Sequence, residues 1–180
     1  MAKEQTGISG EFWFFSQLQR LGYKAYITLG NTKSVDISVE LSNSTIITFD
    51  VKSKTNFGGS FQYLNIPKRE NHFAVFVNLE IQTNSEGKTT LLNEPSLYIL
   101  NSFDIDEIAF HWEARSGSTG YGFEAKLLWF LKFQSMKSIT AKNISDFKHR
   151  HNIIGEIDFK KYCEKIMTLE EFENKYYKQK

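Results

Sequence analysis

The stretch VDISVELSNSTIITFDVK, residues 35–52, decides the fold expected for this chain. Apolar and polar residues alternate in Val35–Glu40 and again in Thr45–Val51, which is the period of half-buried β-strands. The polar run LSNS between the two segments is typical of a turn. The stretch therefore predicts an antiparallel hairpin that folds about Asn43, with one face on a core and the other face polar.

The polar face of this hairpin carries two carboxylates and a lysine. Asp36 and Asp50 are equally far from Asn43 along the chain, so the hairpin places them opposite each other. Like charges directly across a ladder repel, and a fold tolerates them where a cation lies between them or one acid is protonated. Lys52 shares the face of Asp50. The pattern predicts a site for a divalent metal and an anionic substrate, and its alternative interpretation is an ordinary solvated face.

A second acidic residue precedes the hairpin on a predicted helix. The spacing of Ile8, Phe12, Phe15, Leu18 and Gly22 predicts one buried stripe on a helix that Gly10-Glu11 opens and that spans Glu11–Leu21. Glu11 lies at the edge of this stripe, so its carboxylate points along the core. The alternative interpretation is a first-turn glutamate that the helix dipole favours.

Together these residues resemble the PD-(D/E)XK nuclease superfamily, which has the restriction-endonuclease-like fold. The resemblance runs from Gly10 to about Leu79. It consists of a helix with a glutamate, an aspartate on a hairpin, and an acid-x-lysine on the next strand, as in small resolvase-like and Mrr-like members. Val35 stands where the proline of the family's name would precede the aspartate.

The resemblance implies a catalytic role for each matching position. Asp36 and Asp50 would be metal ligands, with the Val51 carbonyl as a further oxygen ligand. Lys52 would position or activate the attacking water and help to neutralise the phosphate. Glu11 would bind a second metal or orient water. Hard oxygen ligands favour Mg²⁺ or Mn²⁺ over zinc, and the four histidines of the chain are dispersed.

Other residues are candidates for binding the substrate. Lys54 shares the strand face of Asp50 and Lys52 if the strand continues. Gln62 follows the lysine at the distance where some superfamily members carry a glutamine or tyrosine on a helix. The segment Lys126–Arg150 holds six basic residues against Asp146 alone, and this excess suits a phosphate backbone or, alternatively, a solvated face. Its proposed contacts are Lys142, Lys148 and Arg150.

The whole chain predicts an α/β domain with a restriction-endonuclease-like core. We expect a central mixed sheet of four to five strands flanked by helices over about residues 8–115, and a helical C-terminal extension over about residues 121–180. The apolar run His72–Leu79 predicts a strand buried on both faces. The sequence TLEE at residues 168–171 predicts a capping box that opens a terminal helix.

Composition limits the class of protein. The chain has 180 residues, a net charge of +1 and 15% aromatic residues, which suits one well-packed domain. One cysteine, Cys163, and a polar start favour a cytoplasmic location without a signal peptide or membrane helix.

The function that these features predict is a Mg²⁺- or Mn²⁺-dependent endonuclease that hydrolyses DNA in restriction, repair or junction processing. RNA remains open as a substrate, and a homodimer is an option because many such enzymes cut one strand with each subunit. The alternative is a non-catalytic module that keeps the nuclease fold and binds nucleic acid or protein.

Overall fold

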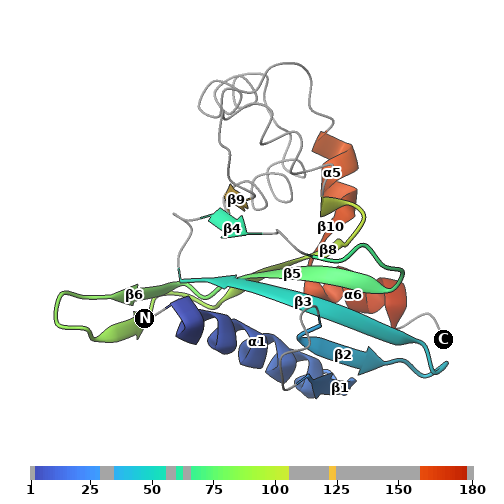
Figure 1. Cartoon of the computed structure of the whole chain (residues 1–180), viewed down its shortest axis with the longest axis horizontal. Helices are drawn as coiled ribbons and strands as arrows, with labels where there is room; N and C mark the ends of the chain where they lie inside the picture. Colours follow the sequence, from blue (N-terminus) through green and yellow to red (C-terminus); the bar gives the residue numbers. More distant parts are fainter. Residues whose placement is uncertain are drawn as a thin grey trace.

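The computed structural model describes residues 3–28, 35–55, 60–62, 66–105, 122–124 and 159–177. These residues form an α/β structure in which helices flank a mixed sheet (Figure 1). The main sheet has six strands in the order β1-β2-β3-β5-β8-β10, rather than the expected four to five. Their bounds are β1 Lys24–Ile27, β2 Ile37–Glu40, β3 Ile46–Lys54, β5 His72–Asn78, β8 Ser96–Asn101 and β10 Ile166–Met167.

The sheet is antiparallel except at its centre. β1, β2 and β3 form an antiparallel meander, β3 and β5 run parallel, and β8 is antiparallel to both β5 and β10. Every residue of β5 is buried, which confirms the strand expected over the run that begins at His72. A parallel strand at the centre is covered on both faces, and this explains its continuous apolar sequence.

The hairpin predicted about Asn43 is present with the expected register. Ile37 pairs with Phe49 and Val39 with Ile47, and all four side chains are buried on one face. The side chains therefore alternate between the two faces of the hairpin as predicted, and the polar side chains of β2 lie on the opposite face. β3 continues to Lys54, beyond the end expected from its alternation.

The first helix differs from the prediction in its start and in its buried face. α1 spans Lys3–Arg20, so Gly10 lies inside the helix rather than at its start. The buried positions include Gly10, Phe14 and Leu18, while Ile8 and Phe12 of the expected stripe are exposed. The reason is that the small residue Gly10 lets the helix approach β3 closely, and this contact sets the rotation of the helix.

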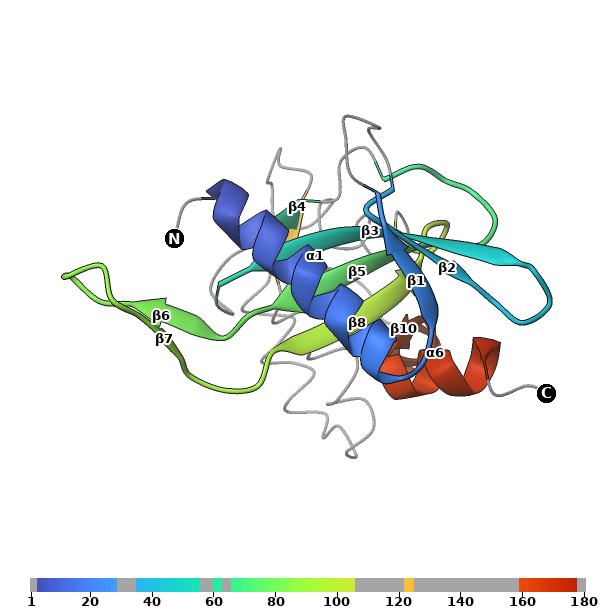
Figure 2. The same cartoon turned by 90° about the horizontal axis from the view of Figure 1, so that it is seen from below.

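The core lies between the sheet and two helices on one face. α1 and α6, which spans Leu169–Tyr176, cover this face, as Figures 1 and 2 show. Phe49 of β3 contacts both Phe14 of α1 and Phe172 of α6, with ring centroids 5.2 and 5.5 Å apart. Thr168 and Glu171 form the predicted capping box at the start of α6.

The described residues of the C-terminal part form strands as well as helices, whereas a helical extension was expected. Its described residues include the strands β9, Gly122–Glu124, and β10, as well as the helices α5, Phe159–Lys165, and α6. β10 completes the main sheet, and its pairing with β8 was not predicted because the partners are far apart in the sequence.

Two short two-stranded sheets complete the described structure. β4, Ser60–Gln62, pairs with β9, and β6, Ile81–Thr83, pairs with β7, Thr89–Leu91. β6 and β7 extend beyond the main sheet at the left of Figure 1. Among the helices that the structure describes, none combines the length and the apolar character needed to cross a membrane.

Candidate active site

Asp36 lies where β2 and β3 separate. The β2–β3 ladder ends at the pair Ile37 and Phe49, so the same register places Asp36 opposite Asp50. The Asp36 N–H donates to the Phe49 carbonyl at 2.8 Å, and the Val51 N–H donates to Asp36 Oδ2 at 2.6 Å. The carboxylate thus takes the place of a backbone acceptor where β2 no longer accompanies β3, and this holds it in one orientation.

Asp50 lies in the middle of the sheet and contacts the ammonium group of Lys52. Its side chain is buried, although β3 directs it to the polar face of the hairpin. The Lys52 ammonium forms an ion pair and a hydrogen bond with Asp50 Oδ1. The two side chains come from the same face of one strand, two residues apart, as the sequence predicts. Lys52 is half-buried and so keeps access to solvent.

Glu11 reaches the same region from α1. Its side chain is half-buried, and its pKa is raised first by this burial, then by the nearby Asp36, while Lys52 lowers it and Asp50 raises it further. The pKa of Asp36 is likewise raised by burial, and the Asp50 carboxylate adds to this effect against the opposing Val51 N–H. The three acids and the lysine therefore form one electrostatic group, with more negative than positive charge when all are ionised.

The oxygen atoms near Asp36 suit a hard cation. Val51 directs its N–H toward Asp36, and because a strand residue points its N–H and C=O to the same side, its carbonyl faces the same way. Asp36, Asp50 and the Val51 carbonyl therefore offer oxygen atoms of the kind that Mg²⁺ or Mn²⁺ prefers. In the described part of the chain, no three His, Cys, Asp or Glu side chains form a metal-binding group, so Glu11 does not complete such a set.

The predicted substrate-binding residues are only partly placed. Lys54 lies on the same face of β3 as Asp50, because the strand continues as far as this residue. Gln62 lies on β4 and pairs with Gly122, so the comparison with a helix-borne glutamine is wrong. The helix expected there is replaced by a strand because its backbone pairs with β9. Lys142, Lys148 and Arg150 lie outside the described residues.

One further residue lies beside the site and was not predicted from the sequence. His72 is fully buried on β5, next to Thr48 of β3, and its Nδ1 lies 2.8 Å from Thr48 Oγ1. Burial lowers the pKa of His72, and the nearby Asp50 carboxylate raises it in part. Within the described residues, Nε2 is buried and has no hydrogen-bond partner. The missing signal was the parallel pairing of β3 with β5, which no local pattern reveals.

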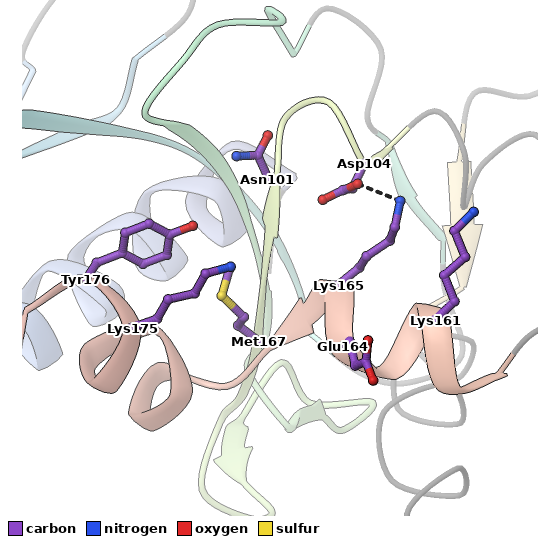
Figure 3. A pocket seen from close by; sticks show the side chains of 8 residues that line it. All are labelled: Asn101, Asp104, Lys161, Glu164, Lys165, Met167, Lys175 and Tyr176. Carbon is purple, nitrogen blue, oxygen red and sulfur yellow. Dashed lines mark hydrogen bonds and ion pairs between the residues drawn. The ribbon is translucent and has the colours of Figure 1, made fainter. Parts of the chain in front are cut away.

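A separate pocket lies at the β10 edge of the sheet, between β8, β10 and the two C-terminal helices. Its volume is about 230 Å³. Figure 3 shows Lys165 of α5 and Asp104, which follows β8, pointing toward each other, with Nζ and Oδ1 2.7 Å apart. None of the predicted catalytic residues lines the pocket. The lining residues are Asn101, Asp104, Lys161, Glu164, Lys165, Met167, Lys175 and Tyr176.

Comparison of the chain with protein-family models, with curated proteins and with solved structures finds no match. The functional interpretation therefore rests on the geometry of the site itself.

Proposed function

We propose that the protein is a metal-dependent endonuclease of the PD-(D/E)XK type that hydrolyses phosphodiester bonds in DNA. The observation that supports this most is the register that sets Asp36 opposite Asp50, with Lys52 in contact with Asp50. A glutamate on the preceding helix lies in the same electrostatic group. This is the order of helix, hairpin and acid-x-lysine that the sequence resemblance implies.

The residues of the site suit the separate tasks of the reaction. A bound Mg²⁺ or Mn²⁺ would supply Lewis acidity and a water of lowered pKa. Asp36 and Asp50 would hold the ion, and the Val51 N–H keeps the Asp36 carboxylate in its orientation. Lys52 would donate to a phosphate oxygen and offset its charge.

Glu11 suits the uptake of a proton from the attacking water. Because burial and neighbouring acids raise its pKa, Glu11 binds a proton more readily than an exposed glutamate does. Its position on α1 places this group at the side of the acid pair, rather than within it. Glu11→Gln should therefore lower the turnover number more than the affinity for DNA.

The proposal is tested by cleavage of supercoiled, linear, branched and methylated DNA with Mg²⁺ or Mn²⁺, with RNA as a parallel substrate. Lys52→Ala should abolish cleavage and leave folding and DNA binding nearly intact. Lys24→Ala is the matched control, because Lys24 forms a similar ion pair with Glu40 on the same sheet, 2.6 Å between Nζ and Oε2. Unchanged turnover in Lys52→Ala would refute the assigned role of the lysine.

A non-catalytic nucleic-acid or protein-binding module is the second candidate. It is favoured by the finding that Glu11 does not join the other acids in a three-residue metal group within the described chain. Such a module would bind DNA or a protein without cleaving any of the tested substrates. Tight binding of DNA or a protein by the wild type, with no cleavage of any tested substrate in the presence of Mg²⁺ or Mn²⁺, would support this candidate over the nuclease.

A further inference from the structure

The pocket at the β10 edge of the sheet gathers basic side chains from two helices. Lys161 and Lys165 of α5 and Lys175 of α6 line it, together with the acids Asp104 and Glu164. The described lining therefore carries three positive and two negative charges when all five groups are ionised. A hollow with an excess of ammonium groups attracts anions. The charge of the lining thus favours an anionic ligand.

Neutral hydrogen-bond donors add to the ammonium groups. Asn101 Oδ1 accepts from the Phe103 N–H at 3.0 Å, so the group that Asn101 can offer to a ligand is its NH₂. Tyr176 contributes a hydroxyl. In Figure 3 the ends of Lys175 and Tyr176 point toward the space between α6 and the end of β8, where Asn101 lies. Donors from α5, α6 and β8 therefore approach a ligand from several sides rather than in one plane.

The ion pair between Lys165 and Asp104 lies at the wall of the pocket. Lys165 Nζ and Asp104 Oδ1 are 2.7 Å apart, and the two side chains are 22% and 28% exposed. Asp104 thus holds the Lys165 ammonium at the pocket, and its carboxylate competes with any anion for that ammonium. Removing the Asp104 charge should strengthen anion binding.

The size and the donor types of the pocket indicate which anion fits. Its volume of about 230 Å³ is below the roughly 300 Å³ at which pockets for drug-sized ligands begin, so it suits a small group. Lysine ammoniums are compact point charges, which can surround a tetrahedral oxyanion. A planar carboxylate is matched best by the flat fork of arginine, and no arginine lines the pocket among the residues that the structure describes. These features favour phosphate over a carboxylate.

We propose that this pocket binds a phosphate group, either as inorganic phosphate or as the terminal phosphate of a larger molecule. Lys161, Lys175 and the Asn101 NH₂ donate to its oxygens, and Lys165 is shared between the phosphate and Asp104. The bound group links α5 to α6 and to the end of β8. The inference does not depend on the nuclease activity, because none of the predicted catalytic residues lines the pocket.

The test is isothermal titration calorimetry of the full chain with inorganic phosphate, at an ionic strength held constant with sodium chloride. Lys175→Gln should weaken phosphate binding about tenfold or more, the usual effect of losing a hydrogen bond to a charged group. Lys24→Gln is the matched control and should leave the affinity unchanged. It removes the same charge from an exposed lysine of β1, at the opposite edge of the sheet.

A variant of opposite sign separates a binding site from a general effect of charge. Asp104→Asn should raise the affinity for phosphate several-fold, because Lys165 is then released to the ligand. Glu40→Gln breaks the comparable ion pair with Lys24, 2.6 Å between Nζ and Oε2, and should not change the affinity. If Asp104→Asn fails to fold by circular dichroism, Lys161→Gln takes its place with an expected loss of affinity.

Further titrations identify the source of the phosphate. Equal affinity for inorganic phosphate and for a nucleoside 5′-monophosphate would mean that the phosphate group alone is recognised. Tighter binding of a 5′-phosphorylated oligonucleotide than of its 5′-hydroxyl form, with the difference lost in Lys175→Gln, would identify the end of a strand. A wild type that binds no phosphate at millimolar concentrations would overturn the proposal. Equal affinities of Lys175→Gln and Lys24→Gln would overturn it as well.

Discussion

Gly10 of α1 lies directly against Ser53 of β3. A Cβ atom built on Gly10 would be 2.3 Å from Ser53 Cβ and 2.6 Å from Ser53 Oγ, closer than such atoms approach. The same serine donates to the Thr6 carbonyl at 2.6 Å, one helical turn earlier. The contact fixes both the rotation of α1 and the distance between its axis and the sheet. Glu11, the next residue, is thereby held beside the acid pair.

Gly10→Ala should destabilise the protein, although alanine is the better helix former. The propensity gain is about 1 kcal/mol, whereas overpacking at a rigid contact costs about 1–3 kcal/mol. The clash is with the root of the Ser53 side chain, which cannot rotate away, so the cost should lie at the upper end. Urea denaturation should show a net loss in the free energy of unfolding.

Gly7→Ala is the control on the same helix. A Cβ atom on Gly7 would have no neighbour within 4 Å, so only the propensity gain applies. This variant should be more stable than the wild type by up to about 1 kcal/mol. Equal effects of the two substitutions would contradict the close contact. Ser53→Gly, added to Gly10→Ala, should recover part of the lost stability because it removes the clashing Cβ.

The features that the sequence predicted correctly are local. The hairpin register follows from the side-chain alternation and from the position of Asn43, both of which lie within the hairpin itself. The capping box of Thr168 and Glu171 involves residues three apart. The placement of Asp36 opposite Asp50 was predictable for the same reason, since the hairpin alone determines it.

The features that the sequence did not predict depend on distant pairings. The apolar spacing of Ile8 and Phe12 marks a helix correctly, but it cannot tell which of two faces meets the sheet. That choice depends on Ser53, which lies far along the chain from Gly10. His72 joins the site through the parallel pairing of β3 and β5, and the same limitation hid it.

The stability of the protein should fall in mild acid because of His72. Its pKa is lowered from the ordinary value near 6.5 mainly by burial, so the unfolded chain binds a proton at a pH where the folded state does not. The neutral imidazole therefore contributes its full share of the free energy of unfolding at pH values above the pKa of His72 in the unfolded chain. This contribution is lost as the pH falls through the pKa of His72 in the folded protein. The free energy of unfolding should change by no more than about 1.4 kcal/mol per pH unit, because one proton is involved.

His72→Asn isolates this contribution. Asparagine retains a polar atom near the Thr48 hydroxyl but does not titrate in this range. We would measure the free energy of unfolding of the wild type and of His72→Asn by urea denaturation at several pH values between neutral and mildly acidic. The difference between the two free energies should narrow or reverse as the pH falls. Parallel pH profiles for the wild type and variant would mean that another group causes the acid sensitivity.

The basic segment Lys126–Arg150 is testable without a description of its structure. If Lys142, Lys148 and Arg150 bind phosphates, their replacement by Gln should weaken DNA binding and reduce its salt dependence. The slope of log affinity against log salt should fall by about 0.9 for each phosphate that is no longer neutralised. Fluorescence anisotropy at several salt concentrations measures it. An unchanged slope would leave the segment as a solvated surface.

Metal binding at the acid pair can be measured independently of the substrate, through its effect on stability. The pKa of Asp36 is raised in the folded protein. Its favourable contribution to the free energy of unfolding is therefore fully present below its ordinary pKa of 3.8 and is lost as the pH rises through its pKa in the folded protein. At neutral pH the ionised carboxylate therefore destabilises the metal-free fold. A bound divalent ion offsets this penalty and stabilises by about 2.7 kcal/mol at a hundredfold excess over its Kd.

Asp36→Asn should separate metal binding from structure. The amide oxygen still accepts from the Val51 N–H, while the charge opposite Asp50 is removed. Without metal, the variant should be at least as stable as the wild type at neutral pH, and it should lose most of the Mg²⁺- or Mn²⁺-induced rise in Tm. Glu40→Gln, which removes a half-buried acid from the adjoining strand β2, should keep that rise. A rise of equal size in Asp36→Asn and wild type would place the ion elsewhere. Strong destabilisation of the metal-free variant would instead mean that the Asp36 carboxylate serves the fold through Val51.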